Sequence, residues 1–125
     1  MILGVGIDLI ETSRVETSWK RFGERFLGRI FLPAEIGYCL GMKLPARHLA
    51  ARFAAKEAVS KAFGTGIGSK LGWKDIEVCR REGGQPFLVL HGGGEALARE
   101  FGVRNTHLSL THHETAAAAV AVLES

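Results

Sequence analysis

The chain has 125 residues, of which 46% are hydrophobic and 23% charged, and it contains sixteen glycines and two cysteines. These values describe one compact domain spanning residues 1–125, and they exclude a disordered chain and a collagen-like repeat. A chain of this size leaves little room for a deep cleft within one subunit, so we expect a catalytic site near a surface or between subunits.

Neither a membrane span nor a targeting segment is evident in the sequence. No apolar run approaches the roughly 18 residues of a bilayer-crossing helix, and residues 1–5 lack the positive charge that begins a secretory signal. We therefore expect a cytoplasmic protein with no membrane partner. Cys39 and Cys79 lie in apolar stretches without CxxC spacing, which favours buried thiols over a disulfide framework.

Positive charge is concentrated in two segments of a chain whose formal net charge is +3. Residues 14–29 hold five bases and two acids, and residues 47–61 hold four bases and one acid. Two basic segments on a mildly acidic body indicate two anionic partners, one a macromolecule and one a phosphorylated small molecule. On charge alone, a pair of solvated helix faces is an equally good interpretation.

The chain begins with a predicted strand. Residues 1–10 are aliphatic and β-branched, interrupted by two glycines, which is typical of a buried strand. Asp8 is the only charged residue among them. Burying a carboxylate without a partner costs several kcal/mol of folding free energy. Asp8 is therefore expected to have a charged partner or a metal ion.

Short helices are predicted next. The spacing of residues 13–16 is that of a capping box, which predicts a helix starting there. Gly23 and Gly28 divide that helix, and Pro33 begins another in which Glu35 suits the positive end of the helix dipole. The side chains of the first helix expected to face a core are Val15, Trp19 and Phe22.

The longest helical pattern covers residues 45–63, and Gly64 is placed to end it. The rest of the chain predicts a hairpin through Gly83-Gly84, a short helix and two final strands. The ranges are 73–82 and 85–91 for the hairpin strands, 95–101 for the helix, and 107–111 and 117–123 for the last strands. This order predicts a single small mixed domain of the α+β class.

Glu57 and Lys61 are the first candidates for chemistry. They are four residues apart on the long helix, so both point from one face, and an ordinary surface ion pair would explain them equally well. If the fold brings Asp8 close, two carboxylates beside a lysine would suit Mg²⁺ bound to a diphosphate, since Mg²⁺ prefers oxygen ligands and takes one or two carboxylates plus phosphate oxygens.

The loop after the long helix contains Gly64-Thr65-Gly66, whose amides can approach an anion closely. A plain helix cap is the simpler interpretation, and the order of residues excludes a Walker loop because Lys61 precedes the glycines. His107, His112 and His113 do not have a common zinc spacing. His112 is instead a candidate for contact with a phosphate or the reacting hydroxyl.

Two separated motifs resemble those of the holo-[acyl-carrier-protein] synthases, the short phosphopantetheinyl transferases. Residues 6–14, GIDLIETSR, resemble the family's GxDxxxxxR, and residues 53–61, FAAKEAVSK, resemble its (W/F)xxKExxxK. The resemblance implies the 4′-phosphopantetheinyl transferase fold, in which a long central helix packs on an antiparallel sheet. It also implies a homotrimer with active sites at the subunit interfaces, acting on coenzyme A and an apo-acyl carrier protein of fatty-acid or polyketide synthesis.

The resemblance implies a role for each matching residue. Asp8 and Glu57 would bind Mg²⁺, with Lys61 at the phosphates, and the base would be a metal-bound water or Glu57 itself. The family departures are small: Leu32 replaces a frequent Thr, and His113 replaces a small polar residue. The coenzyme A site would include Arg52, Lys61, Gly64, Thr65, Gly66 and His112, and the carrier protein would meet Arg14, Arg21 and Arg25.

The implied reaction moves the 4′-phosphopantetheine arm of coenzyme A to a serine of the carrier protein and leaves 3′,5′-ADP. Two other classes compete with it. A nucleic-acid-binding module would interleave bases with exposed aromatic residues, whereas Trp19 and Phe22 fit a core stripe, so we expect no nucleic-acid partner. A purely structural oligomerisation subunit would retain the fold without the transfer activity.

Overall fold

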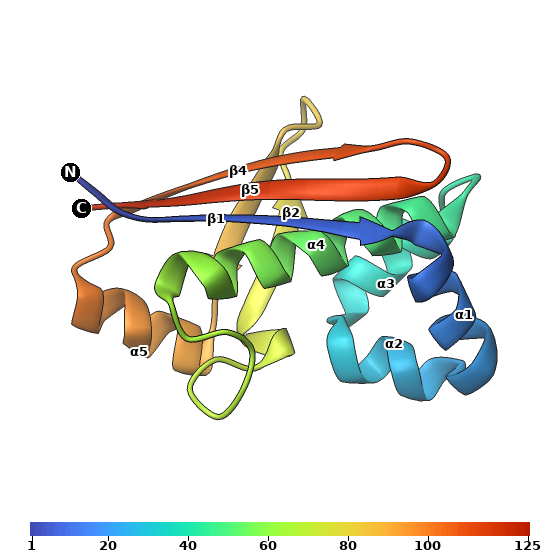
Figure 1. Cartoon of the computed structure of the whole chain (residues 1–125), viewed down its shortest axis with the longest axis horizontal. Coiled ribbons are helices and arrows are strands. Elements are labelled where there is room, and N and C mark those ends of the chain that lie inside the picture. Colours follow the sequence, from blue (N-terminus) through green and yellow to red (C-terminus); the bar gives the residue numbers. More distant parts are fainter.

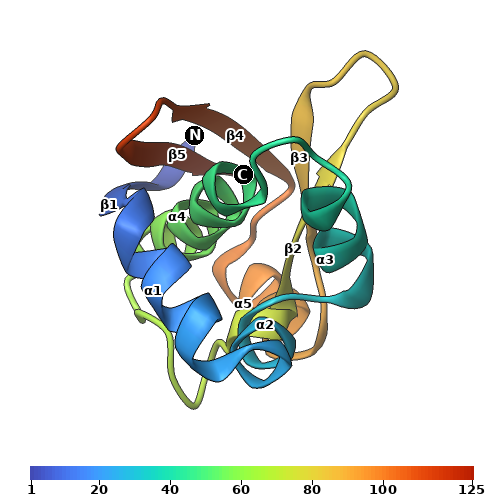
Figure 2. The same ribbon diagram turned by 90° about the vertical axis from the view of Figure 1, so that its right-hand side faces the viewer.

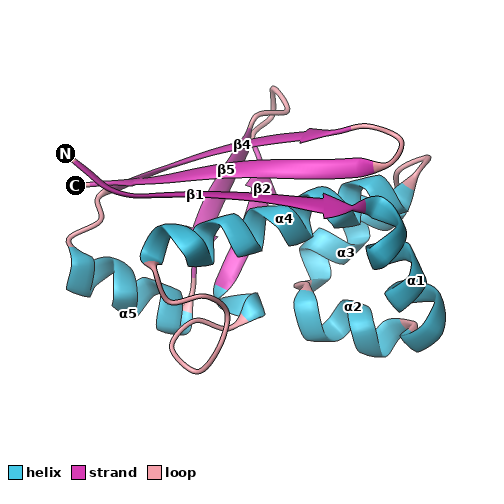
Figure 3. Cartoon of the chain, viewed as in Figure 1, coloured by secondary structure: helices cyan, strands magenta, loops and turns pink.

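The computed structural model describes all 125 residues, Met1–Ser125, and contains helices and strands in the mixed order expected of an α+β chain (Figures 1 and 3). In chain order the elements are β1 (Ile2–Glu11), α1 (Thr12–Phe22), α2 (Glu24–Ile30), α3 (Pro33–Leu40), α4 (Pro45–Phe63), the 3-10 turn η1 (Trp73–Asp75), β2 (Ile76–Arg80), β3 (Pro86–Leu90), α5 (Gly92–Phe101), β4 (Asn105–His112) and β5 (Ala116–Glu124).

The strands form two antiparallel sheets. In the three-stranded sheet β5 lies between β1 and β4, and Asp8 of β1 is opposite Ala119 of β5. β2 and β3 form a separate hairpin. The two chain ends lie side by side, with the Ser125 amide donating to the Met1 carbonyl at 2.9 Å (Figure 1).

The long helix α4 organises the core. Its alanines allow neighbouring elements to approach closely, and thirteen of its nineteen residues are buried. Figure 2, viewed along α4, shows it enclosed by the three-stranded sheet, α1 and the β2–β3 hairpin. Because α4 contributes to both hydrophobic clusters, through residues such as Leu49 and Val59, it joins the helical end of the molecule to the sheet.

β1 packs directly on the backbone of α4 at two glycines. A Cβ atom on Gly4 would lie 2.0 Å from the Ala62 carbonyl oxygen, and one on Gly6 would lie 1.8 Å from that of Ala58. No side chain larger than hydrogen fits there without moving the strand or the helix. This close packing places Asp8, two residues beyond Gly6 on the same face of the strand, against α4.

The prediction of a buried first strand is wrong for the outer face of β1. Val5, Ile7 and Leu9 are 61%, 64% and 72% exposed in the single chain. Successive strand residues alternate in direction, so the glycines and Asp8 face α4 while these apolar side chains face away. β1 is also an edge strand, with β5 as its only partner in the sheet.

Several local predictions are confirmed and others are corrected. The helix 45–63 and its end at Gly64, which has φ +79°, are confirmed, as are the hairpin and the two final strands. The capping box at Ser13 is wrong, because α1 begins at Thr12 without a side-chain cap. Phe22 is half exposed, and the last helix begins earlier than expected, at Gly92.

The cysteine prediction holds for one of the two residues. Cys39 is fully buried, and burial raises the pKa of its thiol to about 11. Cys79 is partly exposed, and both thiols are free. None of the helices combines the length and the apolar character that crossing a bilayer would require.

Candidate active site

Asp8 and Lys61 meet across the β1–α4 packing. Lys61 Nζ lies 2.9 Å from Asp8 Oδ1 and donates a second hydrogen bond to the Ile7 carbonyl at 3.1 Å. The Asp8 side chain is 15% exposed and that of Lys61 is 52% exposed, so the pair sits at the rim of the packed region. The alternative of an ordinary i,i+4 pair between Glu57 and Lys61 is therefore wrong, because Lys61 bonds to the strand.

Glu57 lines the same hollow as Asp8 and Lys61, which we call the carboxylate pocket. Its volume is about 410 Å³. Burial raises the pKa of Glu57, the negative charge of Asp8 raises it further, and Lys61 opposes both effects. The pocket is lined by Asp8, Leu9, Ile10, Arg14, Val15, Ser18, Phe26, Phe53, Glu57 and Lys61.

The carboxylate pocket offers two carboxylates and no third metal ligand. No group of three or more His, Cys, Asp or Glu side chains is close enough to hold a metal ion. Two acids facing one hollow repel each other when both are ionised, which is the cause of part of the pKa shift of Glu57. A divalent cation with oxygen preference would relieve that repulsion.

The glycine loop lines a separate hollow of about 320 Å³ together with Ser69 and Lys70. The amide of Gly64 donates to the Lys61 carbonyl at 3.0 Å, and that of Gly66 donates to the Ser60 carbonyl at 3.2 Å. Both amides are already paired within the chain, as in the plain helix cap that is the simpler of the two interpretations of this loop. Thr65 lies in the same wall, and its hydroxyl donates to the Gly66 carbonyl.

Arg52 and His112 lie together in a third hollow of about 310 Å³, which we call the arginine–histidine hollow. The Arg52 guanidinium lies 4.3 Å from the centre of the Tyr38 ring, and Arg80 lies 5.3 Å from the same ring. The rings of His48 and His112 are 5.0 Å apart at a steep angle. Two arginines and two histidines thus line one hollow, and the charge of the two guanidinium groups suits it to an anion.

Partial burial and positive neighbours act on the pKa of both histidines of this hollow. Partial burial lowers the pKa of both below their usual 6.5. For His48 the next cause is His112, and for His112 it is Arg47; Arg52 and Arg80 act on both. Sequence reasoning missed His48 and Arg80. His48 precedes Arg52 by four residues on α4, so their shared face was available as a signal.

The structure does not bring all the predicted coenzyme A residues together within one chain. The carboxylate pocket, the glycine-loop hollow and the arginine–histidine hollow have no lining residue in common. Arg52 and Glu57 are five residues apart on α4, which turns their side chains about 140° from each other. One copy of the chain therefore presents Asp8 and His112 in different hollows.

The three predicted carrier-binding arginines are exposed on α1 and α2. Arg14 lines the carboxylate pocket, and the Arg21 guanidinium lies 5.1 Å from the centre of the Phe22 ring. Arg25 lines an adjacent hollow of about 470 Å³ that we call the basic groove. The basic groove is lined by Ser18, Phe22, Arg25, Phe26, Arg29, Ile30 and Trp73, of which Ser18 and Phe26 also line the carboxylate pocket.

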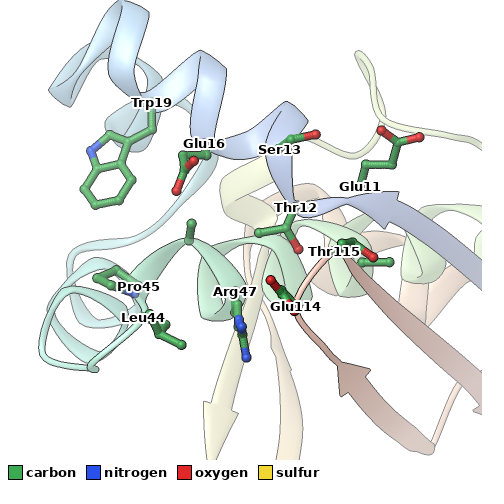
Figure 4. Close-up of a pocket in the computed structure, with 12 residues that line it drawn as sticks. Glu11, Thr12, Ser13, Glu16, Trp19, Leu44, Pro45, Arg47, Glu114 and Thr115 are labelled. Carbon is green, nitrogen blue, oxygen red and sulfur yellow. The ribbon is translucent and has the colours of Figure 1, made fainter.

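A further hollow of about 640 Å³ contains none of the predicted site residues. Figure 4 shows it between the starts of α1 and α4 and the turn that joins β4 to β5. Trp19, Glu16 and Glu114 lie around it with Arg47. Asp8 and Lys61 lie in the carboxylate pocket and not in this hollow, so its size does not mark it as the site of the chemistry.

Comparison with known protein sequences gives one consistent family. The model of the 4′-phosphopantetheinyl transferase superfamily matches residues 4–121. A holo-[acyl-carrier-protein] synthase of Koribacter versatilis is 50% identical over 124 residues, covering 99% of both chains. One of Moorella thermoacetica is 52% identical over 124 residues, covering 99% of this chain and 95% of the relative.

Solved structures agree with the sequence relatives. The holo-[acyl-carrier-protein] synthase of Neisseria meningitidis has a TM-score of 0.92 at 34% identity, with full coverage of both chains. The Helicobacter pylori enzyme in complex with coenzyme A has a TM-score of 0.86 at 32% identity, covering 96% of this chain and 99% of that one. The chain therefore belongs to the 4′-phosphopantetheinyl transferase superfamily, as one of its holo-[acyl-carrier-protein] synthases.

Proposed function

We propose that this enzyme transfers the 4′-phosphopantetheine arm of coenzyme A to a serine of apo-acyl carrier protein, with Mg²⁺ bound at Asp8 and Glu57. The observation that carries the proposal is the meeting of Asp8, Glu57 and Lys61 in one pocket between β1 and α4. A related structure supports it. The Bacillus anthracis holo-(acyl-carrier-protein) synthase, solved in complex with coenzyme A (3′,5′-ADP), is 38% identical with a TM-score of 0.83, and the match covers 100% of this chain and 98% of that one.

The carboxylate pocket fits a magnesium ion. Asp8 and Glu57 supply two hard oxygen ligands. Burial and, after it, the charge of Asp8 raise the pKa of Glu57, and a bound cation would offset both effects. Two protein carboxylates leave the other coordination positions to water and phosphate oxygens, which is the usual arrangement for Mg²⁺. When bound, the ion would neutralise charge on the diphosphate of coenzyme A.

The chain's own residues would position the reactants. The serine oxygen attacks the phosphorus that carries the pantetheine arm, the bond from that phosphorus to the bridging oxygen breaks, and 3′,5′-ADP leaves. Lys61, held by Asp8 at the pocket rim, stabilises the negative charge that develops on the bridging oxygen as it leaves with 3′,5′-ADP. The serine proton passes to Glu57 or to a water molecule at the site, which are the two candidates for the base.

The central experiment measures arm transfer directly. The enzyme is incubated with coenzyme A, Mg²⁺ and apo-carrier protein, and the mass of the carrier is followed. We expect a gain of one phosphopantetheine arm and loss of the reaction when the metal is chelated. Glu57→Gln should lower kcat about 100-fold or more. Glu100→Gln, an exposed change of the same chemistry on α5, is the matched control. Unchanged turnover of Glu57→Gln with Mg²⁺ would refute the role of that carboxylate.

We also propose that the enzyme works as a homotrimer in which two subunits build each site. The carboxylate pocket and the arginine–histidine hollow share no lining residue, which supports this, because one coenzyme A could then be held by hollows of two neighbouring subunits. Val5, Ile7 and Leu9 provide an exposed apolar surface on an edge strand, of the kind that a partner covers.

Light scattering and subunit mixing test the shared site. The expected mass is three times that of the chain. Asp8→Asn and Arg80→Glu would each inactivate a different half of the site, so mixed assemblies of the two inactive variants should recover part of the wild-type activity. A monomeric mass, or mixtures that stay inactive after subunit exchange has been demonstrated, would contradict the shared site.

The carrier protein is proposed to bind through Arg14, Arg21 and Arg25. They are exposed, and the basic groove shares the lining residues Ser18 and Phe26 with the carboxylate pocket. The double change Arg21→Glu and Arg25→Glu, at residues that do not line the carboxylate pocket, should weaken carrier binding at low salt without altering affinity for coenzyme A. The double change Arg99→Glu and Arg104→Glu reverses the same number of charges on another exposed surface and should leave binding as in wild type.

The remaining proposals concern the chain as a whole. We infer that residues 1–125 act as one catalytic domain, which the contribution of α4 to both hydrophobic clusters supports. We also propose that the enzyme acts in the cytoplasm. Cell fractionation that finds the protein and its activity with the membranes would contradict this location.

A further inference from the structure

A fully buried ion pair lies behind the carboxylate pocket. Lys56 immediately precedes Glu57, but its side chain points into the core, where it pairs with Glu35 of α3 at 2.8 Å. The side chains are 0% and 1% exposed. Burial lowers the pKa of Lys56, and the charge and hydrogen bond of Glu35 oppose that effect. Lys56 belongs to the second sequence motif, yet it has no part in the reaction described above.

The ammonium group of Lys56 donates three hydrogen bonds, and both carboxylate oxygens of Glu35 accept hydrogen bonds. Lys56 Nζ donates to Glu35 Oε1, to the Ile76 carbonyl at 2.6 Å and to the Trp73 carbonyl at 3.0 Å. Glu35 also accepts from the amides of Leu32 and Val78, each at 2.8 Å. The pair thereby joins α3, α4, η1 and β2. Such a network holds the joined segments in one arrangement because its hydrogen bonds are directional. Apolar residues of similar volume would fill the space without fixing how the segments lie relative to one another.

The segment held most directly is η1, because Lys56 bonds the carbonyl of its first residue and that of the residue after its end. The Trp73 ring packs against Phe53 with 4.8 Å between ring centres. Phe53 lies on α4 one turn before Glu57 and lines the carboxylate pocket. Trp73 lines the basic groove. The two rings therefore form part of the wall at which the pocket and the groove meet.

We propose that Lys56 and Glu35 are positioning residues: they hold Trp73 against Phe53 and so fix the passage by which the carrier's serine reaches the carboxylate pocket. The proposal rests on the proposed function in taking the basic groove as the carrier's route. It assigns a role in presenting the carrier rather than in binding coenzyme A, because Trp73, the ring that the pair holds, lines the basic groove and neither the carboxylate pocket nor the arginine–histidine hollow.

The first test replaces the pair by apolar residues of similar volume, Lys56→Met with Glu35→Leu. Removing both charges avoids leaving one unpaired in the core, so this variant is preferred over either single change. All proteins carry Trp19→Phe, which makes Trp73 the only indole and allows its emission to be followed. We expect a folded enzyme with wild-type affinity for coenzyme A, a red-shifted Trp73 emission and a loss in kcat/KM for the carrier of about tenfold or more.

The second test leaves the pair intact and changes the ring it holds. Trp73→Phe keeps an aromatic contact with Phe53 and should retain most of the activity. Trp73→Leu should show the same loss toward the carrier as the double variant, with unaltered coenzyme A affinity. This comparison decides the matter even if the double variant does not fold, because a merely structural role for the ring would not separate carrier kinetics from coenzyme A binding.

Two results would overturn the proposal. One is a folded Lys56→Met, Glu35→Leu enzyme with wild-type kcat/KM and unchanged Trp73 emission. The other is a Trp73→Leu enzyme with wild-type carrier kinetics. Failure of the proposed function is distinct from both, since it would appear as a wild-type enzyme that adds no arm to the carrier.

Discussion

Replacing Gly6 by alanine should move the carboxylate of Asp8 away from that of Glu57. The added Cβ would lie 1.8 Å from the Ala58 carbonyl oxygen, against about 3.4 Å for an ordinary contact, so β1 must move by about 1.6 Å. Both partners are backbone, so no side chain can rotate away. Overpacking of this kind costs about 3 kcal/mol. For a chain of this length that corresponds to a fall in Tm of about 10 °C.

The displacement also acts on the chemistry, because Asp8 follows Gly6 on the same face of β1. A misplacement of about 1 Å can cost a factor of about 100, so we expect that loss in kcat per folded molecule. Arm transfer at 25 °C and thermal unfolding by circular dichroism measure the two effects. Gly37→Ala, inside α3 with nothing within 4 Å of the new Cβ, should be neutral or stabilising. Wild-type Tm and turnover for Gly6→Ala would refute the reasoning.

Three further predictions follow from the described contacts. Lys61→Met should lower kcat about 100-fold. It should change the free energy of unfolding by only about 1 kcal/mol, because the Lys61 side chain of the pair with Asp8 is half exposed; a loss of stability as large as the loss of transition-state stabilisation would contradict this. The pKa of His112 is lowered in the folded chain, so as the pH falls this histidine is protonated in the unfolded chain before it is protonated in the folded one. Wild type should therefore lose stability relative to His112→Gln as the pH falls below 6.5; the same pH dependence of the unfolding free energy in both proteins would contradict this. Cys79 should react with a thiol reagent before Cys39, whose thiol is buried with a pKa of about 11; fast labelling of both in the native enzyme would be the contrary result.

Local signals in the sequence were enough for much of the fold. The helix 45–63 and the left-handed Gly64 at its end follow from an uninterrupted helical pattern and a glycine in the right place. The outer face of β1 could not be predicted in the same way. Val5, Ile7 and Leu9 are apolar like core residues, and only the three-dimensional arrangement shows that nothing within the chain covers them.

The candidate site was predicted as a set of residues rather than as an arrangement. The motifs indicated Asp8, Glu57 and Lys61, but the bond from Lys61 to Asp8 spans 53 positions, which no local pattern determines. The buried partner of Lys56 is 21 positions away for the same reason. The family resemblance assigns Arg52 and Glu57 to one ligand, whereas the turn of α4 sends their side chains to different faces.

The adjacency of the chain ends has a practical consequence for engineering. Because the Ser125 amide already bonds to the Met1 carbonyl, a short glycine-rich linker could join them without disturbing β1 or β5. New termini could then be opened at the exposed Gly102, which ends α5 and lines none of the hollows described above. A circularly permuted enzyme made in this way would carry its affinity tag between α5 and β4 and leave the edge of β1 unencumbered.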